Sequence, residues 1–185
     1  MTVTIMRSGR KFNAKAPHPR MVFFGDIAAH LSKICMFNGA PDVFYSAAQH
    51  GIIVATEIAK IDGPLGALYG LLHNADRAVI CSDELTRANV SRVIHEALDL
   101  DWPAPEATMR ALAQVEARVD LSERLQLLRG WTETTGPALR AGVWPLRSII
   151  KPMTWDRALD RWIETLRGFA LAASIPNLPS LGDLS

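Results

Sequence analysis

The sequence predicts an all-α domain that carries a small β-hairpin at its N-terminus. Residues 2–24 alternate loosely between apolar and polar side chains and contain breakers such as Ser8-Gly9-Arg10, a pattern typical of two short strands around a polar turn. From residue 26 on, apolar residues recur at three- and four-residue spacing, which indicates amphipathic helices. The chain has 185 residues, 49% of them hydrophobic, which predicts a single domain over residues 1–173 and a loosely ordered tail over 174–185.

Capping residues and breaks in the apolar pattern set the expected helix boundaries. Asp26 precedes an apolar series at helical spacing, as an N-cap residue does, and Ser46 stands in the same position before a second series. Gly63-Pro64 opens a third helix, because proline fits the first helical turn. Residues 130–153 contain several glycines and prolines, which predicts an irregular connection. The remaining helices are expected over about 83–98, over about 105–128 and from Thr154 onward.

The charge balance restricts the classes of partner. Twenty basic and nineteen acidic residues give a formal net charge of +1, so we expect no general binding to nucleic acid or to membrane surfaces. Residues 1–10 lack an apolar core of signal-peptide length, and no run approaches the ~18 apolar residues that a membrane span needs, which predicts a cytoplasmic protein. Cys35 and Cys81 each lie in an apolar stretch and are expected to be buried, reduced thiols.

Two histidines, His50 and His73, lie in apolar helical segments where exposure to bulk water is not expected. His50 precedes Ile52-Ile53-Val54, and His73 follows Leu71-Leu72. A histidine on an apolar helix is more often a hydrogen-bonded core residue than a metal ligand. The pattern by itself leaves both roles open.

Several short motifs follow one another along the chain. They are Ser8-Gly9-Arg10, Gly25-Asp26-Ile27-Ala28, Phe37-Asn38-Gly39, Ala48-Gln49-His50, Leu71-Leu72-His73-Asn74-Ala75, Glu123-Arg124, and Pro152 before the last helix. This ordered series resembles the HD-domain phosphohydrolases of the 5′-nucleotidase type over about residues 7–170, with His73-Asn74 where that family has its His-Asp pair. The resemblance implies an HD-domain helical bundle behind the N-terminal hairpin and a function connected with nucleotides.

In that family, one histidine, the His-Asp pair and a distant aspartate hold a divalent metal. Carried over to this sequence, the resemblance implies the ligands His50, His73, Asn74 and Glu116. Neutral imidazoles suit transition metals, and carboxylates offset the charge of the dication. Asn74 offers a neutral amide oxygen in place of a carboxylate, and Glu116 is one methylene longer than aspartate. We therefore expect Mn, Co, Ni, Zn or Fe to bind weakly, and the purified protein to carry little metal or none.

The family's catalytic position is changed as well. An acidic general acid/base follows the metal histidine by four residues in the family, and this position is Arg77 here. Residues four apart share a helix face, so the guanidinium is expected to point toward the metal and to repel it. Asp76, one residue earlier, is the candidate replacement for the lost acid.

The substrate positions show a similar loss of charge. The family's phosphate-binding arginine corresponds to Met36, and its later aspartate corresponds to Ser82, with Asp83 displaced by one residue. Arg87 is the candidate replacement for the lysine that follows this aspartate. Phe37 keeps an aromatic ring, which either stacks on a base or packs in the core. The candidate substrate residues are thus Phe37, Asp83 and Arg87.

Two functions remain open from the sequence. The first is a weak or inactive HD-domain protein that retains binding of a nucleotide or another phosphate-bearing small molecule. It is favoured because functional charge is altered at Met36, Asn74, Arg77 and Ser82. The second is an active metal-dependent phosphohydrolase with a rebuilt site. The five tryptophans are expected as core residues or as anchors of a homodimer interface.

Overall fold

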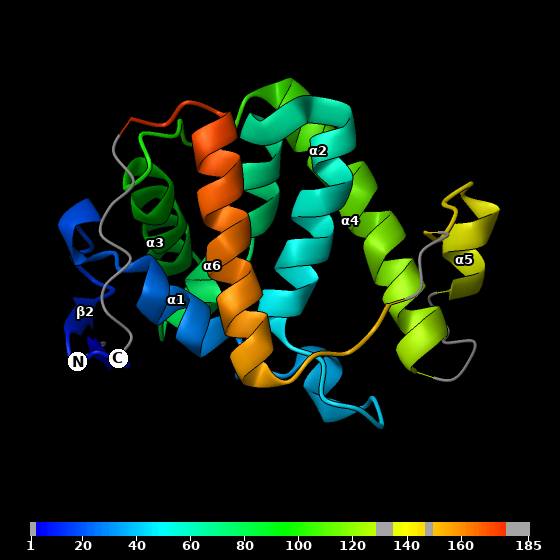
Figure 1. Ribbon diagram of the computed structural model, residues 1–185, viewed down its shortest axis with the longest axis horizontal. Helices are drawn as coiled ribbons and strands as arrows, with labels where there is room; N and C mark the ends of the chain where they lie inside the picture. The colour runs from blue at the N-terminus through cyan, green and yellow to red at the C-terminus, as the bar shows by residue number, and fades with distance from the viewer. Residues whose placement is uncertain (1–2, 129–134, 147–149, 177–185) are drawn as a thin grey trace.

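The computed structural model describes residues 3–128, 135–146 and 150–176, and these form a mostly helical protein with a two-stranded antiparallel hairpin (Figure 1). The strands β1 (Val3–Ile5) and β2 (Lys11–Asn13) pair with Thr4 opposite Phe12. The predicted fold class is confirmed at this level, and most of the predicted tail lies outside the described residues. The helices are α1 (Phe24–Leu31), α2 (Ala47–Leu72), α3 (Glu84–Glu96), α4 (Glu106–Leu127), α5 (Thr135–Arg140) and α6 (Trp155–Ala172).

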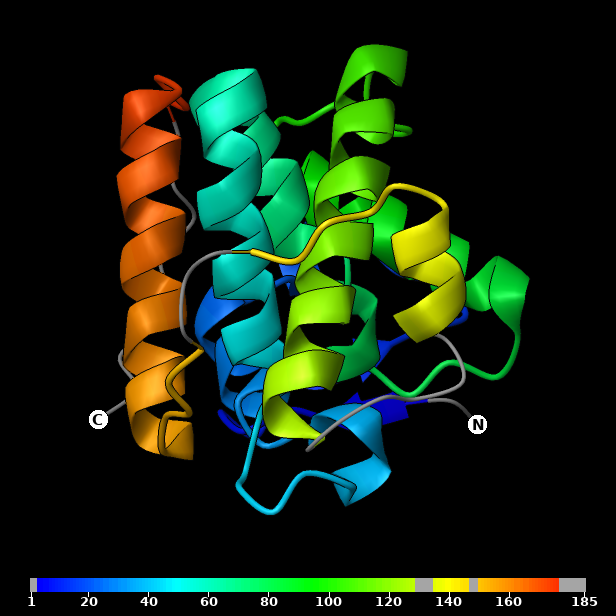
Figure 2. The ribbon, with the colours of Figure 1, turned by 90° about the vertical axis from the view of Figure 1, so that its right-hand side faces the viewer.

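The longest element, α2, is a helical hairpin and not one straight rod. Gly63 has a φ of 68° and a ψ of −166°, a backbone conformation that favours glycine, and Pro64 begins the second half. The chain reverses its direction there, so that the two halves run side by side (Figures 1 and 2). The break predicted at Gly63-Pro64 is confirmed.

Two glycines let the halves of α2 approach each other closely. A Cβ atom on Gly51, in the first half, would lie 3.1 Å from the carbonyl oxygen of Leu71 in the second. A Cβ atom on Gly70 would lie 3.2 Å from the Cα atom of Ala55. Both distances are shorter than ordinary van der Waals contact between carbon or oxygen atoms. Because glycine has no side chain, the start of the first half can lie directly against the end of the second at these two positions.

Helix α1 begins three residues earlier than the capping pattern predicts. Asp26 lies buried in its first turn, and its carboxylate accepts hydrogen bonds from the backbone N–H of Ser8 at 2.8 Å and from the Ser8 hydroxyl at 2.6 Å. The prediction that Asp26 caps this helix is therefore wrong. Its carboxylate instead fastens the turn between β1 and β2 to α1, a contact over 18 residues that local spacing does not reveal.

The cap predicted at Ser46 agrees with the structure, and Asp83, predicted only as a substrate residue, is a further cap. Ser46 is the N-cap residue of α2, and its hydroxyl accepts the backbone N–H three residues later at 3.2 Å. Asp83 caps α3 in the same way, and Thr154 precedes α6. The helices predicted over about 83–98 and 105–128 are present, with ends that differ by at most two residues. Local side-chain chemistry thus sets the starts of α2 and α3.

The connection between α4 and α6 is more ordered than the sequence predicts. The interpretation of residues 130–153 as irregular is wrong for 135–140, which form α5. After α5 the chain crosses over α4 (Figure 2). Polar side chains of α2 and α4 hold this crossing by accepting backbone N–H groups: Ser122 from Leu146 at 2.6 Å, Gln126 from Ile150 at 2.8 Å, and Gln49 from Met153 at 3.0 Å.

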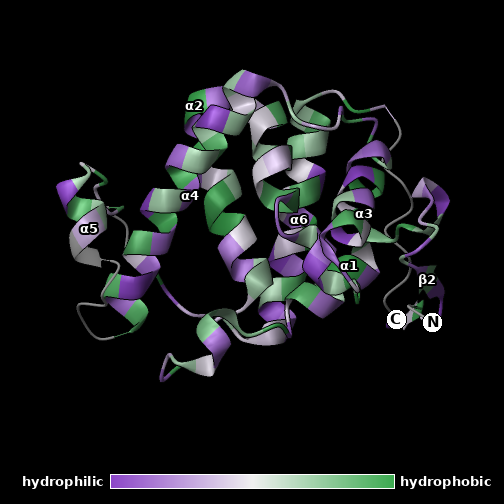
Figure 3. Cartoon of the chain, turned by 180° about the vertical axis from the view of Figure 1, so that it is seen from behind, coloured by the Kyte–Doolittle hydropathy of each residue, from purple (hydrophilic) through white to green (hydrophobic). Residues whose placement is uncertain are grey.

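Helix α2 lies at the centre of the bundle and packs against α4 and α6. Seen from behind, α2 carries many hydrophobic residues, whereas α4 alternates between hydrophobic and hydrophilic ones (Figure 3). Trp162 of α6 is buried in the core, but Trp102, Trp144 and Trp155 are exposed, and Trp131 lies outside the described residues. The prediction of core tryptophans therefore holds for one of the four described.

Two further predictions from composition can be compared with the described residues. Among the described residues, no helix is both long enough and apolar enough to cross a bilayer. Cys35 and Cys81 are free thiols, as predicted, but both are partly exposed and not buried.

We expect Gly70→Ala to lower the free energy of unfolding by about 1–3 kcal/mol, because the added methyl group would overpack the contact with Ala55. Urea unfolding followed by circular dichroism measures the change. Gly168→Ala is the matched control, since Gly168 is also helical but has open space around its Cα. That variant should gain about 0.5–1 kcal/mol from helix propensity. A gain in both variants would contradict a close contact within α2.

His95 is a third buried histidine, outside the candidate ligand set. Its ring stacks on Tyr69 at a centroid separation of 5.5 Å and is tilted against Trp102 at 4.5 Å. Its Nδ1 donates a hydrogen bond to the carbonyl oxygen of Ser91. Burial lowers the pKa of His95 to about 4. The ring is therefore neutral over the whole physiological range.

We expect the free energy of unfolding to fall as the pH drops from about 6.5 toward 4. The unfolded chain protonates His95 near pH 6.5, whereas the folded chain keeps it neutral down to about pH 4, so added protons favour unfolding. Between pH 7.5 and pH 5 this residue accounts for a loss of about 2 kcal/mol. Urea titrations at both pH values should show a smaller loss for His95→Phe than for the wild type. Equal losses would show that His95 is not the responsible group.

Candidate metal centre

His50, at the start of α2, is oriented by a carboxylate on α4. Its Nδ1 lies 2.8 Å and 3.0 Å from the two carboxylate oxygens of Glu123, whose side chain is buried. The hydroxyl of Tyr45 donates a hydrogen bond to the same carboxylate, and burial together with Glu123 raises the pKa of Tyr45 well above its usual range. Because a carboxylate only accepts hydrogen bonds, the Nδ1 of His50 carries a proton, and in the neutral ring Nε2 keeps its lone pair.

His73, directly after α2, is oriented in the same way by the backbone. Its Nδ1 lies 2.6 Å from the carbonyl oxygen of Gly70, so Nδ1 donates and Nε2 carries no proton in the neutral ring. Burial, with a smaller contribution from His50, lowers the pKa of His73 to about 3. At neutral pH the ring of His73 is therefore an uncharged donor of one lone pair.

The two Nε2 atoms face each other at 3.2 Å, and the Oε1 atom of Glu116 lies 3.7 Å from the Nε2 of His73. One ligand atom from each of the three residues falls within 4.8 Å of the other two. Two lone pairs at this separation repel unless a proton or a metal ion lies between them. Two imidazole nitrogens bound to one tetrahedral zinc ion lie about 3.3 Å apart. The donor set therefore fits a divalent transition metal.

Asn74, the remaining predicted ligand, also lies at this centre. Its Nδ2 atom is 2.6 Å from the Nε2 of His73 and donates to that nitrogen's lone pair. A half-turn of the amide would bring Oδ1 to the same place. Asn74 can thus satisfy His73 while no ion is bound and offer a neutral oxygen ligand when one is.

The centre opens into a cavity of about 470 Å³, and Arg77 is one of the residues that line it. Leu72 is the last residue of α2, and Ala75–Ala78 form a 3₁₀ turn, so Arg77 is not on the same α-helix as His73. The expectation based on four-residue helical spacing is therefore wrong, although Arg77 still lines the cavity. Its side chain is exposed and its Nη1 lies 3.1 Å from the sulfur of Met36.

A second, more polar cleft of about 590 Å³ shares Asn74 and Arg77 with this cavity. Asp76 and Arg87 also line it, and the Nε of Arg87 lies 3.3 Å from Oδ2 of Asp76. Asp76 is buried, and this burial raises the pKa of its carboxyl above the usual range, while Arg87 offsets part of the shift. The candidate acid and both candidate arginines therefore lie next to the metal ligands.

Two of the predicted substrate residues have other roles in the structure. Phe37 lies below the guanidinium of Arg124, which is 5.2 Å from its ring centre, and it packs beside Tyr45. Asp83 caps α3 and accepts a hydrogen bond from the hydroxyl of Ser82 at 2.7 Å. Neither residue lines the two cavities described above.

The residues that orient His50 are the part of the site that the sequence analysis missed. Glu123 entered it only as a motif match, and Tyr45 had no assigned role. One signal was available, because Glu123 follows Glu116 by seven residues and therefore lies on the same face of α4. An acidic residue on the inner face of a helix needs a partner, and a histidine in an apolar segment is a natural one.

No protein-family model matches the sequence, and no curated protein matches it. The resemblance to HD-domain phosphohydrolases thus stays a hypothesis based on the motifs of this chain.

We expect Glu123→Gln to weaken metal binding by about 10–100-fold, as is typical when the partner of a ligand histidine is lost. The amide removes the negative charge and no longer selects the tautomer of His50. Tyr45→Phe keeps the carboxylate and should have a smaller effect. Titration of the metal-free protein with Co²⁺ or Zn²⁺ against a chromogenic chelator gives the affinities.

The control is Glu164→Gln, which makes the same change at an exposed ion pair with Arg161 on α6. Its metal affinity should equal that of the wild type, and melting curves should show that all three variants are folded. If Glu123→Gln binds metal as tightly as Glu164→Gln does, Glu123 does not orient a ligand.

Proposed function

We propose that this chain is an HD-type protein that binds a divalent transition metal and, beside it, a nucleotide or another phosphate-bearing small molecule, with weak hydrolysis or none. His50, His73 and Glu116 would hold the metal, with Asn74 as a fourth, neutral ligand. The observation that carries the proposal is the pair of Nε2 atoms at 3.2 Å, each with its other ring nitrogen engaged as a donor.

The order of the candidate ligands along the chain supports the HD type. A first histidine, then a histidine with its neighbour, then a distant acidic residue is the order found in that family. Here they come from the first half of α2, from the end of its second half, and from α4. The two α2 halves and α4 pack against each other, so the ligand order agrees with the arrangement of the helices.

Two arginines beside the centre favour a phosphate group as the ligand. Arg77 and Arg87 both line the polar cleft, and a guanidinium binds phosphate oxygens through two parallel hydrogen bonds. Arg77 also lies against Met36, the position at which the family has its phosphate-binding arginine. The guanidinium of Arg77, from the turn after α2, would thus take the place of the arginine that the family has at the position of Met36.

The changes at two positions are the reason for expecting little turnover. A bound dication polarises a phosphoryl oxygen and lowers the pKa of a water molecule. Asn74 contributes no charge toward holding the ion, and Arg77 occupies the position of the family's general acid/base. The remaining residues bind and orient a phosphate ester without a dedicated proton donor.

An active phosphohydrolase is the second candidate, and one observation favours it. Asp76 lies next to His73 and Asn74 in the polar cleft, with a raised pKa caused by burial. A carboxyl group that keeps its proton at higher pH is suited to general acid catalysis. In this alternative Asp76 protonates the leaving group and Arg87 holds the phosphate.

Phosphate release from a panel of nucleoside mono- and triphosphates with Mn²⁺ or Co²⁺, together with ligand-induced shifts in melting temperature, tests the proposal. We expect little turnover by the wild type, about tenfold tighter metal binding by Asn74→Asp because it restores a ligand charge, and loss of the nucleotide-induced shift in Arg77→Ala. Arg167→Ala, at an exposed position of α6, is the control for loss of one positive charge.

Turnover by the wild type that is abolished in Asp76→Asn would favour the active enzyme over the binding protein. The proposal fails in both forms if the metal-free protein takes up no transition ion and nucleotides cause no shift in melting temperature.

A further inference from the structure

We propose that the ligand of this centre carries a bulky apolar group, and that this group binds in a separate groove between α4 and the segment that follows α5. The inference rests on the proposed function, because it places the phosphate-bearing end of the ligand in the metal cavity. It adds a second subsite and narrows the ligand class to phosphate esters with an aromatic or similarly bulky apolar substituent.

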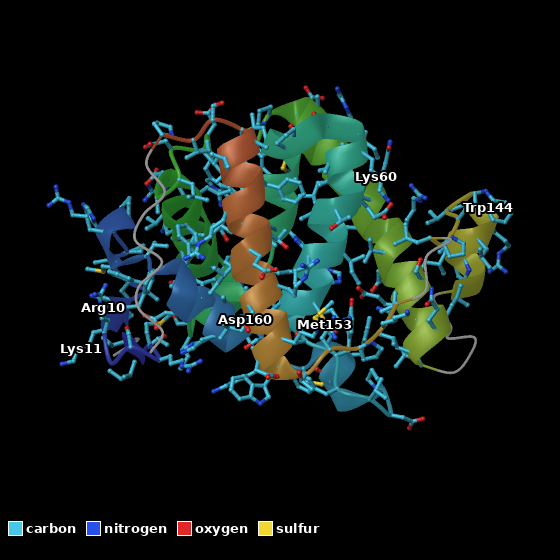
Figure 4. The ribbon with its side chains drawn as sticks, in the orientation of Figure 1. Arg10, Lys11, Lys60, Trp144, Met153 and Asp160 are labelled. Carbon is cyan, nitrogen blue, oxygen red and sulfur yellow. The ribbon has the colours of Figure 1, made fainter. Side chains whose placement is uncertain are left out.

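The groove has a volume of about 630 Å³ and a mostly apolar lining. The methyl groups of Ala113 and Ala117 lie on its α4 side, and Val143 and Trp144 lie on the other. Trp144 is 69% exposed, which is unusual for the largest apolar side chain. Figure 4 places Trp144 beside α5, at the end of the molecule opposite Arg10 and Lys11 of the hairpin.

The groove adjoins the metal cavity along α4. Ala113 and Ala117 line both spaces, and Glu116, a candidate ligand, lies between them in the sequence. Positions four residues apart share one face of a helix, so the two alanines form a low strip along α4. A longer side chain at either position would stand between the two spaces. A ligand held at Glu116 can therefore extend over this strip toward Trp144.

The wall that carries Trp144 is held to α4 by hydrogen bonds. The Nε of Arg118 donates to the carbonyl oxygen of Trp144 at 3.3 Å, and the backbone N–H of Leu146 donates to the hydroxyl of Ser122 at 2.6 Å. Both partners on α4 are within five residues of Ala117. The backbone under the indole ring thus has a set position relative to the alanine strip, as a preformed binding site requires.

The three spaces follow one another in order of polarity. The arginine-lined cleft comes first, the metal cavity second and the apolar groove last, and neighbouring spaces share lining residues. A ligand that fills all three has an anionic end, a bond to phosphorus near the metal ligands, and an apolar end on Trp144. A second copy of this chain would also cover an exposed tryptophan, but it would not require a passage to the metal cavity.

The experiment compares three probes by isothermal titration calorimetry: 1-naphthyl phosphate, methyl phosphate and 1-naphthol. The phosphates are titrated with Mn²⁺ present, and 1-naphthol is titrated into the metal-free protein. We expect 1-naphthyl phosphate to bind at least about tenfold more tightly than methyl phosphate, because its ring stacks on Trp144. 1-Naphthol should bind weakly without metal, since the groove itself needs no ion.

Two variants locate the apolar group. Trp144→Ala should remove the advantage of 1-naphthyl phosphate and the binding of 1-naphthol, while leaving methyl phosphate unchanged. Ala117→Leu should weaken 1-naphthyl phosphate more than 1-naphthol, because the added side chain narrows the passage between the two spaces as well as the groove. Both side chains are exposed, so neither change disturbs the core. Arg110→Ala, at an exposed position of α4 that lines none of the three spaces, is the control for altering this helix.

The outcomes separate this inference from the proposed function. If no metal or methyl phosphate binds but 1-naphthol binds at Trp144, the proposed function fails and the apolar subsite stands. If methyl phosphate binds and the naphthyl group adds nothing, or if Trp144→Ala weakens both phosphates equally, the subsite is refuted. It is also refuted if 1-naphthol does not bind and Trp144→Ala converts a dimer into a monomer by light scattering, because the groove then pairs two copies.

Discussion

The close contact between the two halves of α2 is the constraint on which the candidate centre depends. His50 and His73 are 23 residues apart, and their Nε2 atoms meet at 3.2 Å because Gly51 and Gly70 let two helical segments lie backbone to backbone. Ordinary helix pairs keep their axes 8–10 Å apart with side chains between them. A larger residue at either glycine would separate the halves and with them the two rings. Gly51 also lies close to Trp162 of α6, because a Cβ atom on this glycine would be 3.6 Å from the indole nitrogen.

The electrostatics of the centre follow from what the helices bury there. Glu123 brings a negative charge into the core, and such a charge is stable only with hydrogen-bond donors around it. Tyr45 and His50 supply those donors, and in doing so they direct the Nε2 of His50 toward His73. The centre that results has the buried carboxylate of Glu123 behind His50, the half-exposed carboxylate of Glu116 and two lone pairs, and Asp120 adds a further carboxylate to the lining of the cavity. This arrangement attracts a cation. Arg77, in the 3₁₀ turn that follows α2, is exposed and adds a positive charge to the lining of the cavity.

Three sets of residues on helix α4 contact different parts of the molecule. Val115 and Val119 pack into the core, Glu116 and Glu123 face the two histidines, and Ala113 and Ala117 line the adjoining groove. This division is possible because a helix presents different positions of each turn to different neighbours. It also means that the metal cavity and the apolar groove cannot vary independently, since a shift of α4 would move both.

The sequence by itself determined the features that depend on neighbours within a few residues. The two strands, the cap Ser46 and the break at Gly63-Pro64 follow from backbone preference and from hydrogen bonding between residues close together in the chain. The ordered motifs also pointed to His50, His73 and Glu116, which the structure brings within 4.8 Å of one another. Only the tertiary structure decided the contacts over longer distances. Asp26 binds a turn 18 residues away, and Glu123 orients a histidine 73 residues away. Such partners are set by how the helices pack, and helical spacing carries no information about which face meets which.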